Sequence, residues 1–233
     1  MFKNIVISAF GAGLAACVAV SALQFFTTGP LILEAERFES VGAVAPRGHD
    51  PVAATVAEID SSKEARAPAE GIERALYTTL ANLVIVVGVS LMLLGGIVLR
   101  GDPIDWRRGL LWGTGGFVAV SLLPSLGLPP ELPGTPAAEI ASRQAWWLGA
   151  AVASAAGIAL IVFASRWPVR ATGLALIFLP HLIGAPVPPS HAVAYPGALA
   201  GEFVAASLVV SALMWSMSGA AGGWLLRRLS RGA

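Results

Sequence analysis

Long apolar runs without a charged residue constrain this chain more than any other feature of its sequence. Two of them, 5–26 and 76–99, contain no Asp, Glu, Lys or Arg. A helix needs about 20 mostly apolar residues to cross the hydrocarbon core of a bilayer. Only 12% of the 233 residues are charged and the net charge is +1, too little for the surface of a soluble enzyme or a nucleic-acid-binding protein. The chain is therefore predicted to be an integral membrane protein.

Six stretches come near the length of a membrane span. They are residues 5–26, 76–99, 109–128, 145–165, 168–186 and 198–226. None alternates polar and apolar residues as a membrane-spanning strand does, so helices are expected. We predict an all-α polytopic fold, a transmembrane helical bundle that forms one integral membrane domain over residues 1–233. The fifth stretch is short and contains Pro180 and His181, so it either spans the membrane or re-enters it.

The distribution of basic residues favours six spans, with five spans as the alternative. Six spans with a cytoplasmic N-terminus leave only Arg143 in the two short outer loops. They place nine basic residues in short cytoplasmic segments: Lys3, Arg100, Arg107, Arg108, Arg166, Arg170, Arg227, Arg228 and Arg231. This agrees with the excess of Lys and Arg found in cytoplasmic loops, whereas five spans would put the arginine-rich C-terminus outside. Both termini are therefore predicted to be cytoplasmic.

Other segments give more local expectations. Residues 27–74 form a large, acidic outer loop in this topology, and its part 31–40 has a helix-favouring composition. Two glycine pairs with the spacing of close helix packing, Gly109/Gly113 and Gly219/Gly223, predict helices in contact. Trp215, in the middle of the last stretch, is expected to face lipid. Cys17 is expected to be a buried structural thiol.

Candidate metal ligands are few because the chain has only three histidines. His49 and His191 lie in loops, where solvated side chains are the simpler interpretation, whereas His181 lies in an apolar stretch. Like His181, Glu202 is an ionisable residue in an apolar stretch, at the start of the last one. Capping of the helix N-terminus is the structural alternative for Glu202. Ionisable groups inside a membrane segment indicate function by default. Imidazole and carboxylate together suit divalent cobalt, nickel, zinc or manganese.

No motif for catalysis or ATP hydrolysis is present in the sequence. The chain contains no Gly-x-x-x-x-Gly-Lys-Ser/Thr, no His-Glu-x-x-His and no Gly-x-Ser-x-Gly. We therefore expect a protein that is not an enzyme, that does not hydrolyse ATP and that holds no tightly bound cofactor.

Four phrases, taken in order, resemble the CbtA family of bacterial cobalt transporter subunits. They are GPLILEAE (29–36), LPPELPGT (128–135), RQAWW (143–147) and LPHLIGAP (179–186). The resemblance covers nearly the whole chain and implies uptake of divalent cobalt (Co²⁺) across the inner membrane. It also implies a small single-span partner, CbtB, with a His-rich terminus. The family is described with five spans, whereas the charge pattern here favours six.

The functional residues that the resemblance implies for this chain are Glu34, Glu36, Glu131, His181 and Arg143. With the residues above, the predicted metal ligands are His181, Glu34, Glu36, Glu131, Glu202 and His191. Two alternatives for the function stay open: a non-transporting accessory subunit of a larger membrane complex, and a membrane enzyme in which His181, His191 and a carboxylate converge on one metal. For Glu131, a salt bridge to Arg143 is the structural alternative. Such ligands fit several divalent metals.

Overall fold

The structure is a computed structural model that describes residues 2–44, 71–101 and 103–231. All regular secondary structure in these ranges is helical. The predicted all-α fold is thus confirmed for this part of the chain.

Helices occupy all six stretches that the sequence analysis singled out. Five of the stretches correspond to α1 (Phe2–Phe26), α4 (Ile72–Arg100), α7 (Ile140–Phe163), α8 (Trp167–Ile183) and α9 (Gly197–Arg231). The third stretch is divided into α5 (Trp106–Phe117), the π-helix η1 (Val118–Leu122) and the short α6 (Leu123–Ser125), which follow one another directly. A further helix, α2 (Thr28–Val44), follows α1.

Four of these helices, α1, α4, α7 and α9, are long and apolar enough to cross a membrane. Helix α8 is apolar but has only 17 residues, and the third stretch is interrupted by its π-helical turns. The structure therefore supports a membrane protein with four candidate spans. Six spans remain a prediction.

The segment 27–74, predicted as an outer loop, is helical in part. Helix α2 contains the stretch 31–40 for which helix was expected, and α4 begins at Ile72. Residues 45–70 lie outside the described residues. They include His49 and the carboxylates Asp50, Glu58, Asp60, Glu64 and Glu70. The acidic outer loop therefore stays a prediction.

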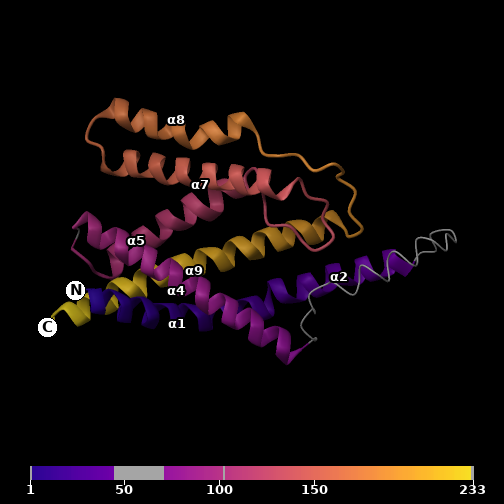
Figure 1. The fold of residues 1–233 in the computed structure, drawn as a ribbon, viewed down its shortest axis with the longest axis horizontal. Coiled ribbons are helices and arrows are strands. Elements are labelled where there is room, and N and C mark those ends of the chain that lie inside the picture. The colour runs from indigo at the N-terminus through magenta and orange to yellow at the C-terminus, as the bar shows by residue number, and fades with distance from the viewer. Residues whose placement is uncertain (1, 45–70, 102, 232–233) are drawn as a thin grey trace.

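Helices α1, α4, α5 and α9 pack into a bundle in which small residues allow close approach (Figure 1). Ala9, Ala12 and Ala16 on α1 have no exposed surface, and a methyl group on Gly13 would lie 2.6 Å from the side chain of Val87. Lipid tails are as apolar as a protein core, so van der Waals packing between closely approaching helices supplies much of the stability of such a bundle.

The two glycine pairs predicted from the sequence face each other across α5 and α9. A methyl group on Gly109 would overlap the carbonyl oxygen of Gly219, and the reverse substitution would overlap the carbonyl oxygen of Gly109. One turn along α5, a methyl group on Gly113 would overlap the carbonyl oxygen of Trp215. The expected close packing is confirmed. We call Gly109, Gly113, Gly219 and Gly223 the glycine seam.

Helices α7 and α8 form an antiparallel hairpin beside the bundle (Figure 1). Gly157 and Gly173 bring the two backbones together, because a methyl group on either would lie 2.5 to 2.6 Å from the carbonyl oxygen of the other. The hairpin contacts the bundle mainly through η1. The sequence analysis did not single out this glycine pair.

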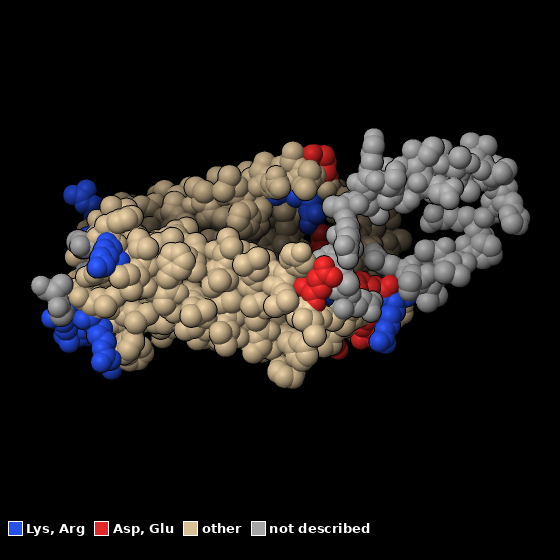
Figure 2. All heavy atoms as spheres, turned by 60° about the horizontal axis from the view of Figure 1, so that its bottom comes forward, with Lys and Arg blue, Asp and Glu red and all other residues tan. Residues whose placement is uncertain are grey.

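Charged residues divide between the two ends of the helices (Figure 2). The basic end, which also holds both chain termini in Figure 1, carries Lys3, Arg100, Arg107, Arg108, Arg166, Arg170, Arg227, Arg228 and Arg231. The other end, which we call the acidic end, carries Glu34, Glu36, Glu73, Glu131, Glu139 and Glu202, together with Arg37, Arg74 and Arg143. This separation follows from the antiparallel order of the helices.

Candidate cation site

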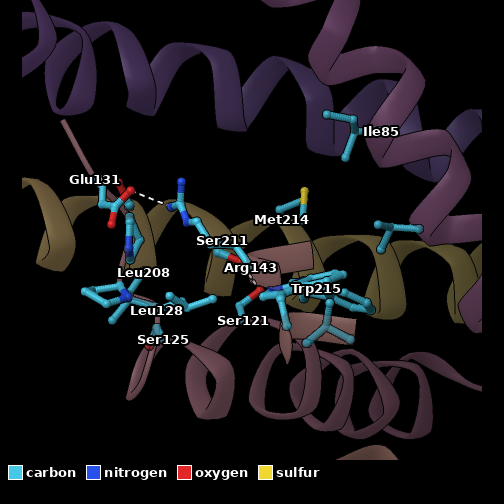
Figure 3. A pocket seen from close by; sticks show the side chains of 16 residues that line it. Ile85, Ser121, Ser125, Leu128, Glu131, Arg143, Leu208, Ser211, Met214 and Trp215 are labelled. Carbon is cyan, nitrogen blue, oxygen red and sulfur yellow. Dashed lines mark hydrogen bonds and ion pairs between the residues drawn. The ribbon is translucent and has the colours of Figure 1, made fainter. Parts of the chain in front are cut away.

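A cavity of about 540 Å³ lies between α4, η1, α7 and α9. Figure 2 shows the hollow between the bundle and the hairpin in which it lies. Its polar lining consists of a carboxylate, a guanidinium and four hydroxyls, from Glu131, Arg143, Ser121, Ser125, Ser207 and Ser211. In Figure 3, Glu131 lies at one end of the cavity and Trp215 at the other. The cavity is therefore polar toward the acidic end and closed by an aromatic side chain toward the middle of the bundle.

An ion pair between Glu131 and Arg143 marks the acidic end of the cavity. The Nη2 group of Arg143 donates a hydrogen bond to Oε2 of Glu131. About a quarter of each side chain is exposed, 28% for Arg143 and 26% for Glu131. A charge-assisted hydrogen bond in partly buried surroundings is stronger than one at the surface. The structural alternative proposed for Glu131 from the sequence, pairing with Arg143, is confirmed.

Buried neighbours fix the loop that carries Glu131. The next residue, Leu132, is 3% exposed and packs with Ala35, Tyr195 and Leu199. The Thr135 hydroxyl donates to the Leu132 carbonyl over 2.6 Å and is hydrogen-bonded to the phenol of Tyr195. These contacts tie the proline-rich loops before α7 and before α9 to each other and to α2, so Glu131 sits on a rigid support.

Arg143 is positioned by the first turn of α7. Glu139 caps this helix by accepting hydrogen bonds from the backbone N–H groups of Ala141 and Ser142 at 2.8 and 2.7 Å. These bonds, first of all the one from Ala141, hold the pKa of the Glu139 carboxyl below its usual value. Glu139 therefore has a structural role as a helix cap, one turn before Arg143.

Another wall of the cavity joins α9 to the π-helix. Ser211 donates a hydrogen bond of 2.7 Å to the hydroxyl of Ser121 in η1. The N–H of Leu123 reaches back five residues to the carbonyl of Val118. Pro124 has no N–H, and its ring would clash with the carbonyl four residues earlier in a regular α-helix. The wider turn just before Pro124 accommodates this ring and brings Ser121 to the cavity.

Four of the other predicted ligands lie away from this cavity. Glu36 on α2 is paired with Arg74 on α4, and Arg74 Nη1 lies 3.1 Å from Glu36 Oε2. Glu34, Glu202 and His191 are exposed to the surroundings.

His181 occupies a separate place near the acidic end of the hairpin. Its ring lies edge-on to that of Trp146, with centroids 5.8 Å apart, and its Nε2 atom is buried. Among the described residues no hydrogen-bond partner contacts this Nε2. The Trp146 indole N–H donates to the carbonyl of Pro180 at 3.3 Å and so holds this contact in place. His181 is thus a buried nitrogen on α8 outside the lining of the cavity.

The structure does not gather the predicted ligands into one metal centre. Within residues 2–44, 71–101 and 103–231, no three His, Cys, Asp or Glu side chains form a group that could hold a metal ion. His181 and His191 in particular form no such group with a carboxylate, which an enzyme with a metal centre at this end would need. The ligand set therefore remains a prediction, and only Glu131 of its members lines the cavity.

Sequence reasoning missed the aromatic and hydroxyl lining of the cavity. Trp215 is 2% exposed, so the expectation that it faces lipid was wrong. Its ring lies against Gly116, where a methyl group would overlap it. Serines such as Ser121 and Ser211 are common in membrane helices, and neither carries a signal in the sequence that marks it as part of a cavity. Cys17 is buried as expected.

Comparison with known families assigns the chain. The family described as "Probable cobalt transporter subunit (CbtA)" matches residues 2–227. The chain belongs to the CbtA family. This agrees with the resemblance seen in the sequence, and it indicates a membrane protein with a role in transport. No curated protein and no solved structure matches the chain.

Proposed function

We propose that this CbtA protein carries Co²⁺ inward across a bacterial inner membrane as one subunit of an uptake system. The observation that carries the proposal is the cavity, which places the Glu131 carboxylate toward the acidic end and hydroxyl groups behind it. Carboxylate, hydroxyl and the nearby thioether of Met214 offer exchangeable oxygen and sulfur ligands. Exchangeable ligands suit an ion that must bind and then leave.

We propose six spans with both termini in the cytoplasm. The separation of charge supports this orientation, because the basic end would then face the cytoplasm as the positive-inside rule requires. The acidic end would face outward and raise the local concentration of cations. Of the other predicted ligands at that end, Glu34, Glu202 and His191 are exposed and would then collect ions rather than hold them, whereas Glu36 is paired with Arg74.

The ion pair at the cavity sets the first step. Co²⁺ that reaches Glu131 competes with the guanidinium of Arg143 for the carboxylate. A divalent ion that moves inward through about 100 mV gains about 4.6 kcal/mol, from about 2.3 kcal/mol per elementary charge. We propose that this potential drives uptake, without ATP hydrolysis by this chain, and that a small single-span, His-rich CbtB-like partner delivers the ion. His181 would take part where the ion enters beside the hairpin.

Cobalt uptake in cells that lack other cobalt importers tests the proposal. The chain is expressed with its small partner, either unchanged or as Glu131→Gln, His181→Ala or Glu34→Gln. We expect Glu131→Gln to abolish uptake and His181→Ala to reduce it strongly. Glu34→Gln, the matched control, removes an exposed carboxylate of the same end and should reduce uptake only slightly. Absence of protein-dependent uptake, despite confirmed insertion, would instead favour an accessory subunit of a larger complex.

A further inference from the structure

The cavity occupies only the acidic half of the helix bundle. Along α4 its lining reaches Val89, along η1 it reaches Val120, and along α9 it reaches Trp215. No described residue nearer the basic end lines it. Each of these three positions lies near the middle of its span. The lining of the cavity therefore ends near the middle of these helices.

Between Trp215 and the basic end, α5 and α9 leave no space between them. Gly109 and Gly219 are in backbone contact, as described above. One turn nearer the basic end, a methyl group on Gly223 would overlap the carbonyl oxygen of Asp105. A gap too narrow for a methyl group cannot hold a hydrated cation, so no path runs between α5 and α9 themselves in their basic halves, and a path toward the basic end would have to pass Trp215 beside this pair.

Trp215 lies where the cavity ends and the seam begins. Its carbonyl oxygen contacts Gly113, which is part of the seam, and its side chain lines the cavity. The ring fits against α5 only because Gly116 has no side chain. Moving the ring from this seat needs only rotation about its own side-chain bonds and a shift of its neighbours, whereas the backbone contacts of the seam cannot open without moving a helix.

We propose that Trp215 is the gate of the cavity on the side of the basic end, and that the structure represents the state open toward the acidic end. The ring resting on Gly116 closes the cavity, and its departure from that seat opens the first part of a path toward the basic end. This inference rests on the proposed function only for the identity of the ion. The gate itself is inferred from the lining of the cavity and from the seat of Trp215 on Gly116.

Thiol labelling from each side of the membrane tests the gate. Ser211→Cys places a reporter thiol in the cavity of a chain with Cys17→Ser, and a membrane-impermeant thiol reagent is added to right-side-out or inside-out vesicles. Ser230→Cys, on an exposed residue near the end of α9, reports which face carries the basic end. We expect the Ser211→Cys thiol to react only from the face opposite to that one. Reaction from both faces, from the basic face alone or from neither would overturn the proposal.

Two variants of the seat then sharpen the test. Trp215→Ala removes the ring, and Gly116→Ala keeps the ring but displaces it from its seat. We expect either to produce labelling from the basic face at a rate at least about tenfold above the background there, which corresponds to about 1.4 kcal/mol less resistance to opening. Gly115→Ala is the matched control, because a methyl group there meets nothing within 4 Å. Unchanged labelling in both variants, at normal insertion, would show that Trp215 does not gate the cavity.

The labelling needs no cobalt, so the two proposals fail separately. One-sided labelling without cobalt uptake would leave the gate standing and remove the proposed cargo. Cobalt uptake with labelling from both faces would keep the cargo and remove the gate.

Discussion

The pair formed by α5 and α9 differs between its two halves. In the basic half, glycines bring the backbones into contact, and a methyl group cannot enter. In the acidic half, α5 continues as η1, and the contact with α9 is a hydrogen bond between Ser211 and Ser121. A cavity lies beside this hydrogen bond. One helix pair therefore provides both a seal and a polar chamber. The change occurs within about one helical turn, at Trp215 and the π-helix.

The hairpin of α7 and α8 shows the same asymmetry. Its glycine contact, Gly157 with Gly173, lies toward the basic end, whereas the acidic end holds Trp146 and His181. Tight backbone packing on one side and polar side chains on the other thus recur in both groups of helices. The comparison suggests that the basic half provides the rigid frame and the acidic half the chemistry.

The largest effect is expected from a methyl group in the glycine seam. Gly219→Ala should lower the free energy of unfolding by about 1–3 kcal/mol, because the added carbon overlaps a backbone carbonyl that cannot move alone. Thermal unfolding of the purified protein in detergent measures this. Gly115→Ala adds the same methyl group to open space and should leave the midpoint unchanged or raise it slightly, since alanine favours helix. Equal unfolding midpoints for Gly219→Ala and Gly115→Ala would contradict the close backbone contact in the glycine seam.

A smaller effect is expected in the hairpin. Gly173→Ala should destabilise the protein by about 1–2 kcal/mol, because only the contact between α7 and α8 has to spread. The same unfolding assay measures it, with Gly149→Ala on α7 as control because a methyl group there meets nothing within 4 Å. A loss larger than that of Gly219→Ala would reverse the order of the two contacts.

Variants of the Glu131–Arg143 ion pair should distinguish its effect on stability from its effect on cobalt uptake. Arg143→Gln or Glu131→Gln alone should cost about 1 kcal/mol of unfolding free energy, between the values of exposed and fully buried pairs. The exchange Glu131→Arg with Arg143→Glu should restore much of this loss. Cobalt uptake should stay low in the exchanged protein if the ion needs the carboxylate on the rigid loop. Full recovery of uptake would mean that the position of the carboxylate does not matter.

The smallest effect concerns the cap of α7. The pKa of Glu139 is lowered in the folded protein, so its stabilising effect is complete above the usual value near 4.5 and is lost as the pH falls through the lower, folded-state value. Glu139→Gln should therefore flatten the fall of the unfolding midpoint between pH 5 and more acidic solution.

The N-cap of α5 gives a parallel test at the basic end. The pKa of Asp105 is lowered mainly by the backbone N–H of Arg108. Asp105→Asn should flatten the acid limb in the same direction, because the same linkage applies. A profile identical to that of the unchanged chain in both variants would contradict the capping roles.

Several features of the fold could be predicted because they depend on local sequence. The helices at all six apolar stretches follow from length and hydropathy, and the contact of the glycine pairs follows from their spacing. The pairing of Glu131 with Arg143 was anticipated only as an alternative. The burial of Trp215 was not, because a tryptophan in mid-span can face lipid or protein, and only Gly116 on another helix decides between them.

The sequence by itself determined that the chain is helical, that it belongs in a membrane and that most of its basic residues lie near the same ends of the apolar segments. These properties follow from composition and from the order of apolar and charged segments along the chain. Only the tertiary structure decided that glycines of α5 and α9 meet face to face, that Ser121 and Ser211 share a hydrogen bond, and that Glu131 alone of the predicted ligands lines the cavity. Contacts between distant helices depend on crossing angles and on local turns such as η1, and hydropathy does not encode them.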